Sequence, residues 1–255
     1  MNAQEVINAH AAIANPQQRD ILMRFFKTSK GEYGEGDKFL GLKVPQTRNI
    51  VKRFKGLMDF NDIRQLLYSE WHEVRLAGFL FLVEEMKNSL PKRKEPLTAK
   101  AEQRKEIVDF YLRHAHKANN WDLVDLSCPY LLGSYLLYPD KNGVLPSRDI
   151  LDKLAADKNM WLQRISVVST LALIRAGEYE DTLRISTELL SHPHDLIHKA
   201  VGWMLREVGK RNKSLLVRYL HDHYSKMHRT TLRYAIERFE EEERKTWLRK
   251  PVNAK

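Results

Sequence analysis

Cysteine is almost absent from this 255-residue sequence, and its single cysteine, Cys128, excludes an intramolecular disulfide and a zinc site built from cysteines. Long apolar runs are missing too, since the longest mostly apolar stretch, residues 76–83, is too short to span a bilayer. The first ten residues lack the basic and apolar regions of a signal peptide. We therefore expect a cytoplasmic protein with no membrane contact.

Strand-like alternation is also scarce, whereas apolar residues recur at three- and four-residue steps along most of the chain. This period predicts helices over seven segments: 21–26, 50–54, 74–86, 107–112, 123–137, 165–173 and 200–208. Helix-breaking glycine and proline residues fall between them, at 31–36, 89–96, 139–146 and 191–193. The sequence therefore predicts an all-α protein.

Positive charge is in excess. Forty-three Lys and Arg residues against 33 Asp and Glu residues give a formal net charge of +10. A balance of this kind favours an anionic partner, most commonly nucleic acid, although ordinary surface basicity gives the same total. The positions of the charges along the sequence must therefore distinguish a nucleic-acid-binding protein from one with an ordinary basic surface.

Five apolar segments resemble one another and carry a polar residue at an equivalent point: Arg75, Asp125, Arg164, Lys199 and Arg233. The last three intervals between these residues have the length of two-helix repeats that stack into a solenoid. We therefore expect a HEAT-like helical-repeat solenoid, a curved α-superhelix with a basic concave face. Residues 1–255 would form one domain, with helices in about 1–30 and a tail from about 249 at its margins.

Four of the five equivalent residues are cationic, so they would form a ladder of positive charge suited to a DNA backbone. The alternative is that each Arg or Lys braces the neighbouring turn. Asp125 is the exception in the ladder. A carboxylate among cations is either a structural ion pair or a working group.

The surroundings of Asp125 favour a functional role for its carboxylate over a structural ion pair. Trp121 lies four residues earlier, so on a helix the indole and the carboxylate share one face. Asn119 or Asn120 is a suitable N-cap, and Asp122 in the first turn is expected to be structural. Trp203 lies four residues after Lys199 on the ladder's face, whereas Trp161, at the start of its helix, is expected in the core.

A carboxylate beside indole rings in a basic groove suits a cation lodged in DNA. Purines alkylated at N3 or N7 carry a positive charge, and indole faces attract cations by roughly 0.5–2 kcal/mol. The charged base is already a good leaving group and needs no acid. One carboxylate can then stabilise the oxocarbenium-like sugar, without a metal or cofactor.

Four segments resemble those of AlkD-like DNA alkylation-repair proteins: residues 39–48 (FLGLKVPQTR), 121–125 (WDLVD), 161–164 (WLQR) and 199–207 (KAVGWMLRE). The resemblance extends over about residues 21–239. It implies a HEAT-like solenoid that excises N3- and N7-alkylated purines from double-stranded DNA without flipping the base. It further implies that Asp125 is the catalytic aspartate, that Trp121 and Trp203 flank the lesion sugar, and that Arg164 holds a phosphate.

Two positions depart from the family's pattern. Asp195-Leu196 replaces aromatic residues before the lysine helix, which puts duplex distortion and substrate range in doubt, and Lys43 stands where a glutamine can occur. We expect a monomer that contacts DNA through eight cations: Lys43, Arg48, Arg75, Lys199, Arg206, Lys210, Arg211 and Arg233.

Two other classes of protein compete with this interpretation. A non-catalytic solenoid that binds DNA or an acidic protein explains the ladder but leaves Asp125 unexplained. A metal-dependent hydrolase would use His192, His194 and His198, or the HDH sequence at 221–223, but a third ligand at a diagnostic spacing is lacking. We expect no metal.

Overall fold

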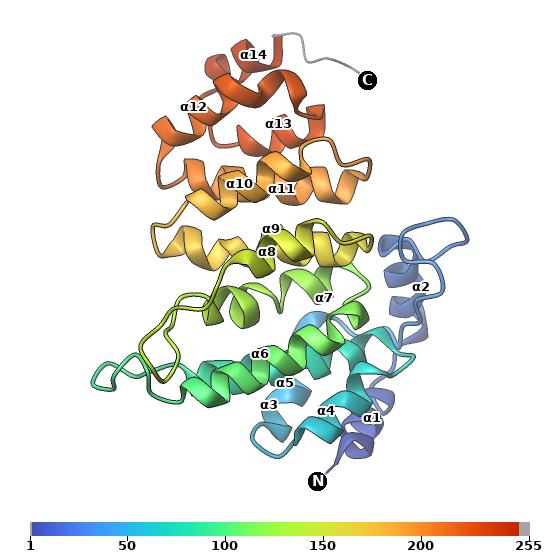
Figure 1. Ribbon diagram of the computed structural model, residues 1–255. Helices are drawn as coiled ribbons and strands as arrows, with labels where there is room; N and C mark the ends of the chain where they lie inside the picture. Colours follow the sequence, from blue (N-terminus) through green and yellow to red (C-terminus); the bar gives the residue numbers. More distant parts are fainter. Residues whose placement is uncertain (1, 250–255) are drawn as a thin grey trace. The chain divides into compact units, whose positions relative to one another are not determined.

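The computed structural model describes residues 2–249 (Figure 1). In this range the chain is helical, and its only β-type pairing is an isolated parallel bridge between Lys38 and Trp71. The predicted all-α class is therefore confirmed. No helix within these residues has both the length and the apolar character needed to cross a membrane. Most of the expected C-terminal tail, residues 250–255, lies outside the described residues.

The chain, for which the sequence predicts one domain, divides into two compact units. Unit 1 comprises the residues up to Leu131 and Tyr138–Val144, and unit 2 comprises Leu132–Leu137 and the residues from Leu145 onward. The helices of unit 1 are α1 (Ala3–Ala11), α2 (Pro16–Phe25), α3 (Val44–Phe54), α4 (Phe60–Leu67), α5 (His72–Ser89), α6 (Ala101–His114) and α7 (Trp121–Asp125). Those of unit 2 are α8 (Asp149–Ala155), α9 (Met160–Arg175), α10 (Glu180–Leu189), α11 (Asp195–Gly209), α12 (Lys213–His223), α13 (Arg229–Ala235) and α14 (Glu241–Arg249).

Helix α5 is the centre of unit 1. It is apolar around most of its circumference, as expected of a helix surrounded by others, and it packs against α3, α4, α6 and α7. Gly78 sits where α4 comes close, since a Cβ there would lie 2.9 Å from a methyl carbon of Leu67. The first turn of α5, beginning at His72, lies beside α7 and so reaches the candidate site.

Helix α2 differs from its neighbours because none of its residues is buried. The Asn15 side chain caps it by accepting a hydrogen bond from the Gln18 amide at 2.9 Å, and Pro16 occupies the first turn. Gly41, at φ 93°, lies against its start, and a Cβ there would be 2.0 Å from the Asn15 carbonyl oxygen. The segment before α3 therefore holds the beginning of α2 by backbone contact.

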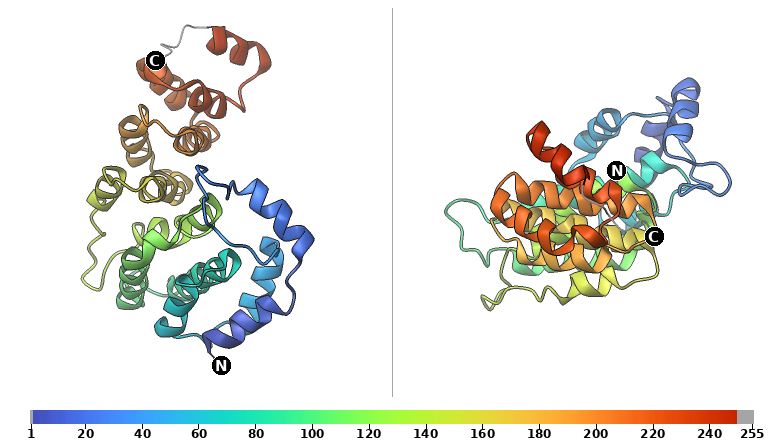
Figure 2. Two further views of the ribbon diagram at one scale, coloured as in Figure 1. Left: turned by 90° about the vertical axis from the view of Figure 1, so that its right-hand side faces the viewer. Right: turned by 90° about the horizontal axis from the view of Figure 1, so that it is seen from above.

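Unit 2 is built of successive helix pairs. Helices α8 and α9 pack together, as do α10 and α11; α9 and α11 are also in contact, and α11 packs against both α12 and α13 (Figures 1 and 2). Gly202 of α11 permits a close approach of α13, because a Cβ there would lie 2.6 Å from the Thr231 carbonyl oxygen. Trp161 is buried at the start of α9, so the prediction of core packing for it is confirmed.

One predicted helix is wrong. Residues 123–137 do not form a continuous α-helix: α7 ends at Asp125, and a π-helical turn spans Pro129–Gly133. Pro129 has no amide hydrogen and its ring crowds the preceding turn, which prevents an α-helix from continuing through it. Asp125 therefore lies at the last turn of a short helix.

Candidate functional site

Trp121 and Asp125 lie on one face of α7, and both side chains are half-buried. The Asn120 side chain caps this helix by accepting a hydrogen bond from the Trp121 amide at 2.9 Å, which confirms one of the two predicted N-caps. Asp122, which lies between Trp121 and Asp125 in the sequence, is buried and accepts a hydrogen bond from the Leu123 amide at 2.9 Å. The predicted structural role of Asp122 is thus confirmed.

A buried charge network holds α7 to α5. His72 lies 2.7 Å from an oxygen of Asp37 through Nδ1 and 2.9 Å from an oxygen of Asp122 through Nε2. The other Asp37 oxygen accepts a hydrogen bond from the Arg75 guanidinium. Burial opposes a charge on His72, but the two carboxylates outweigh it and raise its pKa to about 9. Burial likewise opposes a charge on Asp37, yet bonds from His72 and Arg75 lower its pKa overall.

A column of rings joins the same two helices. The Trp121 indole stacks on Phe26 at 5.2 Å between centroids, Phe26 stacks on Phe39 at 5.1 Å, and Phe39 stacks on His72 at 4.3 Å. Hydrogen bonds to Asp122 and this column thus fix α7 from two directions. The helix that carries Trp121 and Asp125 is therefore braced by buried hydrogen bonds and by ring contacts.

These residues border a cavity of about 400 Å³ in unit 1. Its walls are mostly apolar, with Phe25, Phe26, Phe39 and Trp121 among them, and Asp125 and Lys43 also line it. Glu73 lines the cavity as well, but its carboxylate accepts the amide hydrogens of Leu40, Gly41 and Leu42 at 2.8–3.0 Å. Glu73 therefore stabilises the backbone of residues 40–42. Asp125 is the acidic side chain that lies on the same helical face as Trp121.

In unit 2, the predicted site residues lie on α9 and α11. Arg164 is only 5% exposed, and its guanidinium donates a hydrogen bond to the Leu196 carbonyl oxygen at 2.6 Å. Lys199 is half-buried and pairs with Asp195 at 2.8 Å. Trp203 is half-buried one turn after Lys199. Arg164 thus ties α9 to the first turn of the helix that carries Trp203.

Comparison with known proteins bears on the whole chain. Residues 6–239 match the family described as DNA alkylation repair enzyme. The chain belongs to this family. Among solved structures, a predicted DNA alkylation repair enzyme from Enterococcus faecalis is 15% identical, with a TM-score of 0.64 over 89% of this chain and 97% of that one. That likeness supports a shared helical-repeat fold, and no curated protein matches the sequence.

The eight cations predicted to bind DNA have different surroundings in this alkylation-repair family member. Lys43 and Arg48 are exposed at the start of α3, and Arg233 is exposed on α13. Arg75 is buried, and it donates to Asp37 and to the Ser69 and Glu70 carbonyl oxygens. Arg75 therefore takes the bracing role, the alternative for this ladder, and we leave it out of the proposed DNA contacts.

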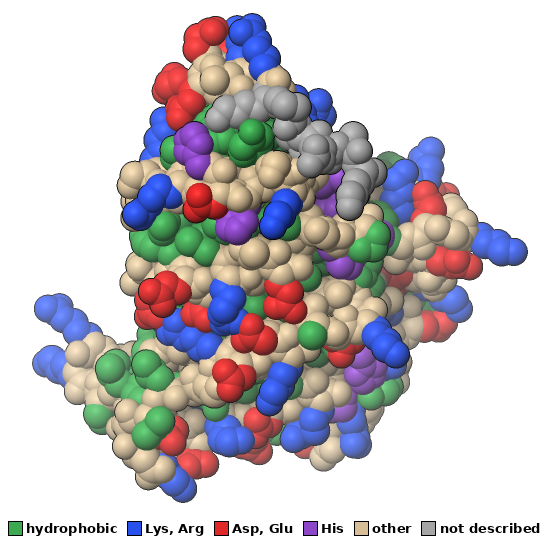
Figure 3. Space-filling view, turned by 45° about the horizontal axis from the view of Figure 1, so that its top comes forward, with side chains coloured by type: hydrophobic (Ala, Val, Ile, Leu, Met, Phe, Trp, Pro, Cys, Tyr) green, Lys and Arg blue, Asp and Glu red, His purple; other side chains and the backbone are tan. Residues whose placement is uncertain are grey.

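Three more of these cations gather around Glu207 on α11. Lys210 and Arg211 lie 2.5 and 3.5 Å from its carboxylate, and Arg206 pairs with Glu237 of the following repeat. Acidic and basic side chains are similarly interspersed over the face shown in Figure 3. The DNA contacts of Arg206, Lys210 and Arg211 stay predictions, in which phosphate would compete with these carboxylates.

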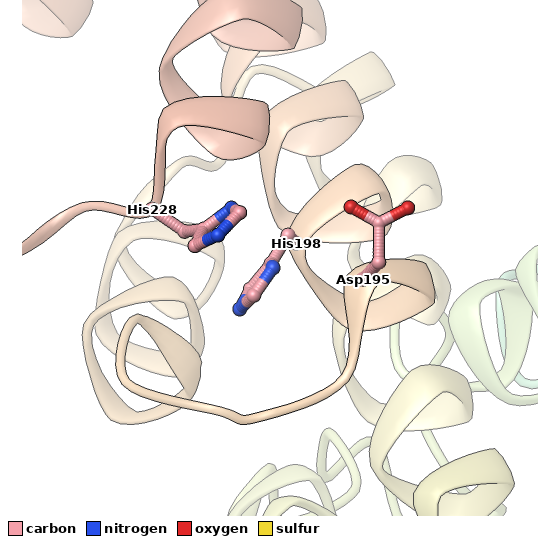
Figure 4. Close-up of side chains that lie close together, drawn as sticks. All are labelled: Asp195, His198 and His228. Atoms are coloured by element: carbon pink, nitrogen blue, oxygen red, sulfur yellow. The ribbon is translucent and has the colours of Figure 1, made fainter. Parts of the chain in front are cut away.

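Two of the histidines considered for a metal, His192 and His194, form hydrogen bonds within the protein. His192 Nδ1 accepts a hydrogen bond from the His194 amide, and His194 Nδ1 caps α11 by accepting one from the Leu196 amide. A different set, Asp195, His198 and His228, brings possible ligand atoms within 4.8 Å of one another (Figure 4). The two rings are stacked, 4.0 Å apart and 16° from parallel, so their in-plane nitrogen lone pairs do not converge on one point. We therefore assign no metal to this cluster.

Sequence reasoning missed the supports of the site. Asp37 and Phe26 carry no recognisable motif, and each reaches its partner across a long stretch of chain. His72 lies two residues before the segment 74–86 that the apolar period predicts as a helix. A buried polar residue followed by Glu73 in an otherwise apolar helix was the available signal.

Proposed function

We propose that this family member is a DNA glycosylase that excises cationic N3- and N7-alkylated purines from double-stranded DNA. The observation that carries the proposal is the pairing of Trp121 and Asp125 on one face of α7, beside an aromatic-walled cavity. Aromatic faces favour a cationic base, and a half-buried carboxylate favours a cationic sugar. The same site therefore suits the cationic base before the bond breaks and the cationic sugar after it breaks.

The reaction breaks the bond between C1′ of the sugar and the purine nitrogen, and the electron pair leaves with the base. Because the alkylated purine starts with a positive charge, it departs as a neutral molecule and needs no proton from the protein. The positive charge passes to the sugar, where Asp125 stabilises it. Water then adds to C1′ and releases a proton, which leaves an abasic site.

The support of α7 matters because electrostatic stabilisation depends on a carboxylate fixed before the charge develops. His72 and Asp122 hold the first turn of α7, and Phe26 holds the Trp121 ring. In the proposal, Trp203 contacts the lesion nucleotide together with Trp121. A phosphate near them would compete with the Leu196 carbonyl oxygen for the Arg164 guanidinium, whereas the exposed Lys43 and Arg48 contribute backbone contacts.

The test is release of free base from duplex DNA that contains 7-methylguanine. We expect release by the wild type and a loss of at least about 100-fold in Asp125→Asn, the scale for removing one stabilising charge. Asp109→Asn is the matched control, since Asp109 is a partly exposed carboxylate of α6 that pairs with Lys105. Binding without release by the wild type would instead favour a non-catalytic DNA-binding protein.

A further inference from the structure

A small polar pocket of about 210 Å³ lies in unit 1, where α4 and α6 end and α5 and α7 begin. Most of its lining belongs to the turns between these helices: Tyr68, Ser69, His116, Lys117 and Asn119. Arg75, from the first turn of α5, lines it as well. Asn119 lies two residues before Trp121, so the pocket borders the start of the helix that carries the candidate site.

Two residues of this lining have unused hydrogen-bonding capacity. Arg75 is 6% exposed, and its Nε–H group has no partner among the described residues. The buried Oδ1 atom of Asn119 also has no partner there, and a half-turn of the amide brings its NH2 group to the same place. Buried polar groups are nearly always hydrogen-bonded, so two such residues in one pocket indicate a polar ligand. The remaining donors of Arg75 stay bonded to Asp37 and to the turn after α4, which keeps its bracing role.

Positive charge gathers around this pocket. His116 and Lys117 line it, and Arg64 of α4 and Arg113 of α6 lie close enough to act on the same neighbouring group, His114. Burial lowers the pKa of His114, and the charges of these four residues lower it further. Within residues 2–249, no salt bridge involves Arg64, Arg113 or Lys117. Their charges are therefore available to an anionic ligand.

The nearby carboxylates are occupied by other cations. Asp109 lies one turn before Arg113 on α6, but it pairs with Lys105 at 2.5 Å. Glu70 lies in the turn between α4 and α5, and it pairs with Lys38 at 2.8 Å. The pocket thus differs from the surface around Glu207 in unit 2, where each cation has an acidic partner.

Tyr68 positions the ammonium group of Lys117. Tyr68 is 52% exposed, and the Lys117 Nζ atom lies over its ring, 4.0 Å from the centroid. This cation–π contact restrains a flexible side chain and leaves the N–H groups of the ammonium able to donate. Lysine, tyrosine, serine and asparagine side chains are the groups that commonly donate to phosphate oxygens in protein–DNA complexes. All four residue types line this pocket.

We propose that this pocket holds a backbone phosphate of the DNA duplex, with Lys117 and Tyr68 as its main contacts. A phosphate suits a small polar pocket that offers several donors and an excess of positive charge. Neither Lys117 nor Tyr68 is among the residues that the sequence predicts to bind DNA. The proposal rests on the proposed function only in placing DNA beside Trp121, and it does not require excision of a base.

The test is the salt dependence of binding to an undamaged duplex, measured by fluorescence anisotropy. Each neutralised phosphate contributes about −0.9 to the logarithmic slope of affinity against salt. Lys117→Gln should therefore make the slope shallower by about 0.9 and weaken binding about 5- to 10-fold at about 0.1 M salt. Lys117→Arg should keep the wild-type slope, because it retains the charge and the donors.

Lys153→Gln is the matched control, since Lys153 is an exposed lysine of α8 that forms no salt bridge within the described part of the chain. It removes the same charge and should leave the slope almost unchanged. Thermal melting without DNA checks that each variant is folded. A second arm adds inorganic phosphate in place of DNA, and it separates a site for a free anion from a site for the DNA backbone.

Three results would overturn the assignment. One is an equal slope in the wild type and Lys117→Gln, and another is a wild type that does not bind duplex DNA. The third is a rise in melting temperature with inorganic phosphate that depends on Lys117, while DNA binding does not. If the slope depends on Lys117 but the wild type releases no base, the glycosylase proposal fails and the phosphate pocket stands.

Discussion

His72 is buried between the carboxylates of Asp37 and Asp122, so its ionisation links the stability of the protein to pH. The charged groups that face it are these two carboxylates, with Arg75 on the far side of Asp37. The perturbation we choose is His72→Asn. This substitution keeps a polar side chain of smaller size and removes the titrating group.

The expected magnitude follows from the pKa. Folding raises the pKa of His72 from its ordinary value of 6.5 to about 9. At about 1.36 kcal/mol for each pKa unit, the shift corresponds to about 3 kcal/mol of folding free energy. Because the folded pKa is the higher one, this stabilisation is fully present below pH 6.5 and is lost as the pH rises through 9.

The assay is urea denaturation of the wild type and His72→Asn at pH 6, 7.5 and 10. Between pH 6 and pH 10 the wild type should lose about 3 kcal/mol more unfolding free energy than the variant, since other titrating groups contribute equally to both. Equal losses in the two proteins would refute the charged state of His72. His72→Asn should also be the less stable protein at pH 6, because Asp122 loses its partner.

Two further predictions concern the loop before α3 and the DNA contacts. Glu73→Gln should lower the free energy of unfolding in urea by about 2–3 kcal/mol, since a buried carboxylate that accepts three backbone amide hydrogens loses its charge and one acceptor; an unchanged value would contradict the role given to Glu73. The affinity for duplex DNA, measured by fluorescence anisotropy, should fall with salt at a logarithmic slope of roughly −3 or steeper, because several phosphates are neutralised at once. A flat salt profile would exclude the predicted backbone contacts.

Much of the fold was predictable because helix formation leaves local marks. The apolar period identified α5, α9 and α11, and the glycine and proline clusters marked the loops between helices. The single helix predicted over residues 123–137 failed at Pro129, where local backbone chemistry outweighs apolar spacing. The N-cap at Asn120 was predictable for the same reason, since capping depends on residues one to three positions apart.

The site was predictable only in part. Trp121 and Asp125 share a helical face, which their spacing alone requires. The partner of Arg75 was not predictable, because Asp37 lies in a loop 38 residues earlier and spacing cannot report a tertiary contact. The contact of Phe26 with Trp121 is more distant still along the chain. The sequence leaves two roles open for Arg75, a DNA contact or bracing of the neighbouring turn, and its burial favours the bracing role.

The positive charge of the base is the central claim, and a pair of matched lesions tests it most directly. Single-turnover release should be measured with 7-methylguanine and with its neutral isostere, 7-methyl-7-deazaguanine, which has the same shape without the charge. We predict release of the charged base by the wild type, a loss of at least about 100-fold in Asp125→Asn, and no release of the neutral base. Release of both bases at similar rates, or full activity in Asp125→Asn, would contradict the account.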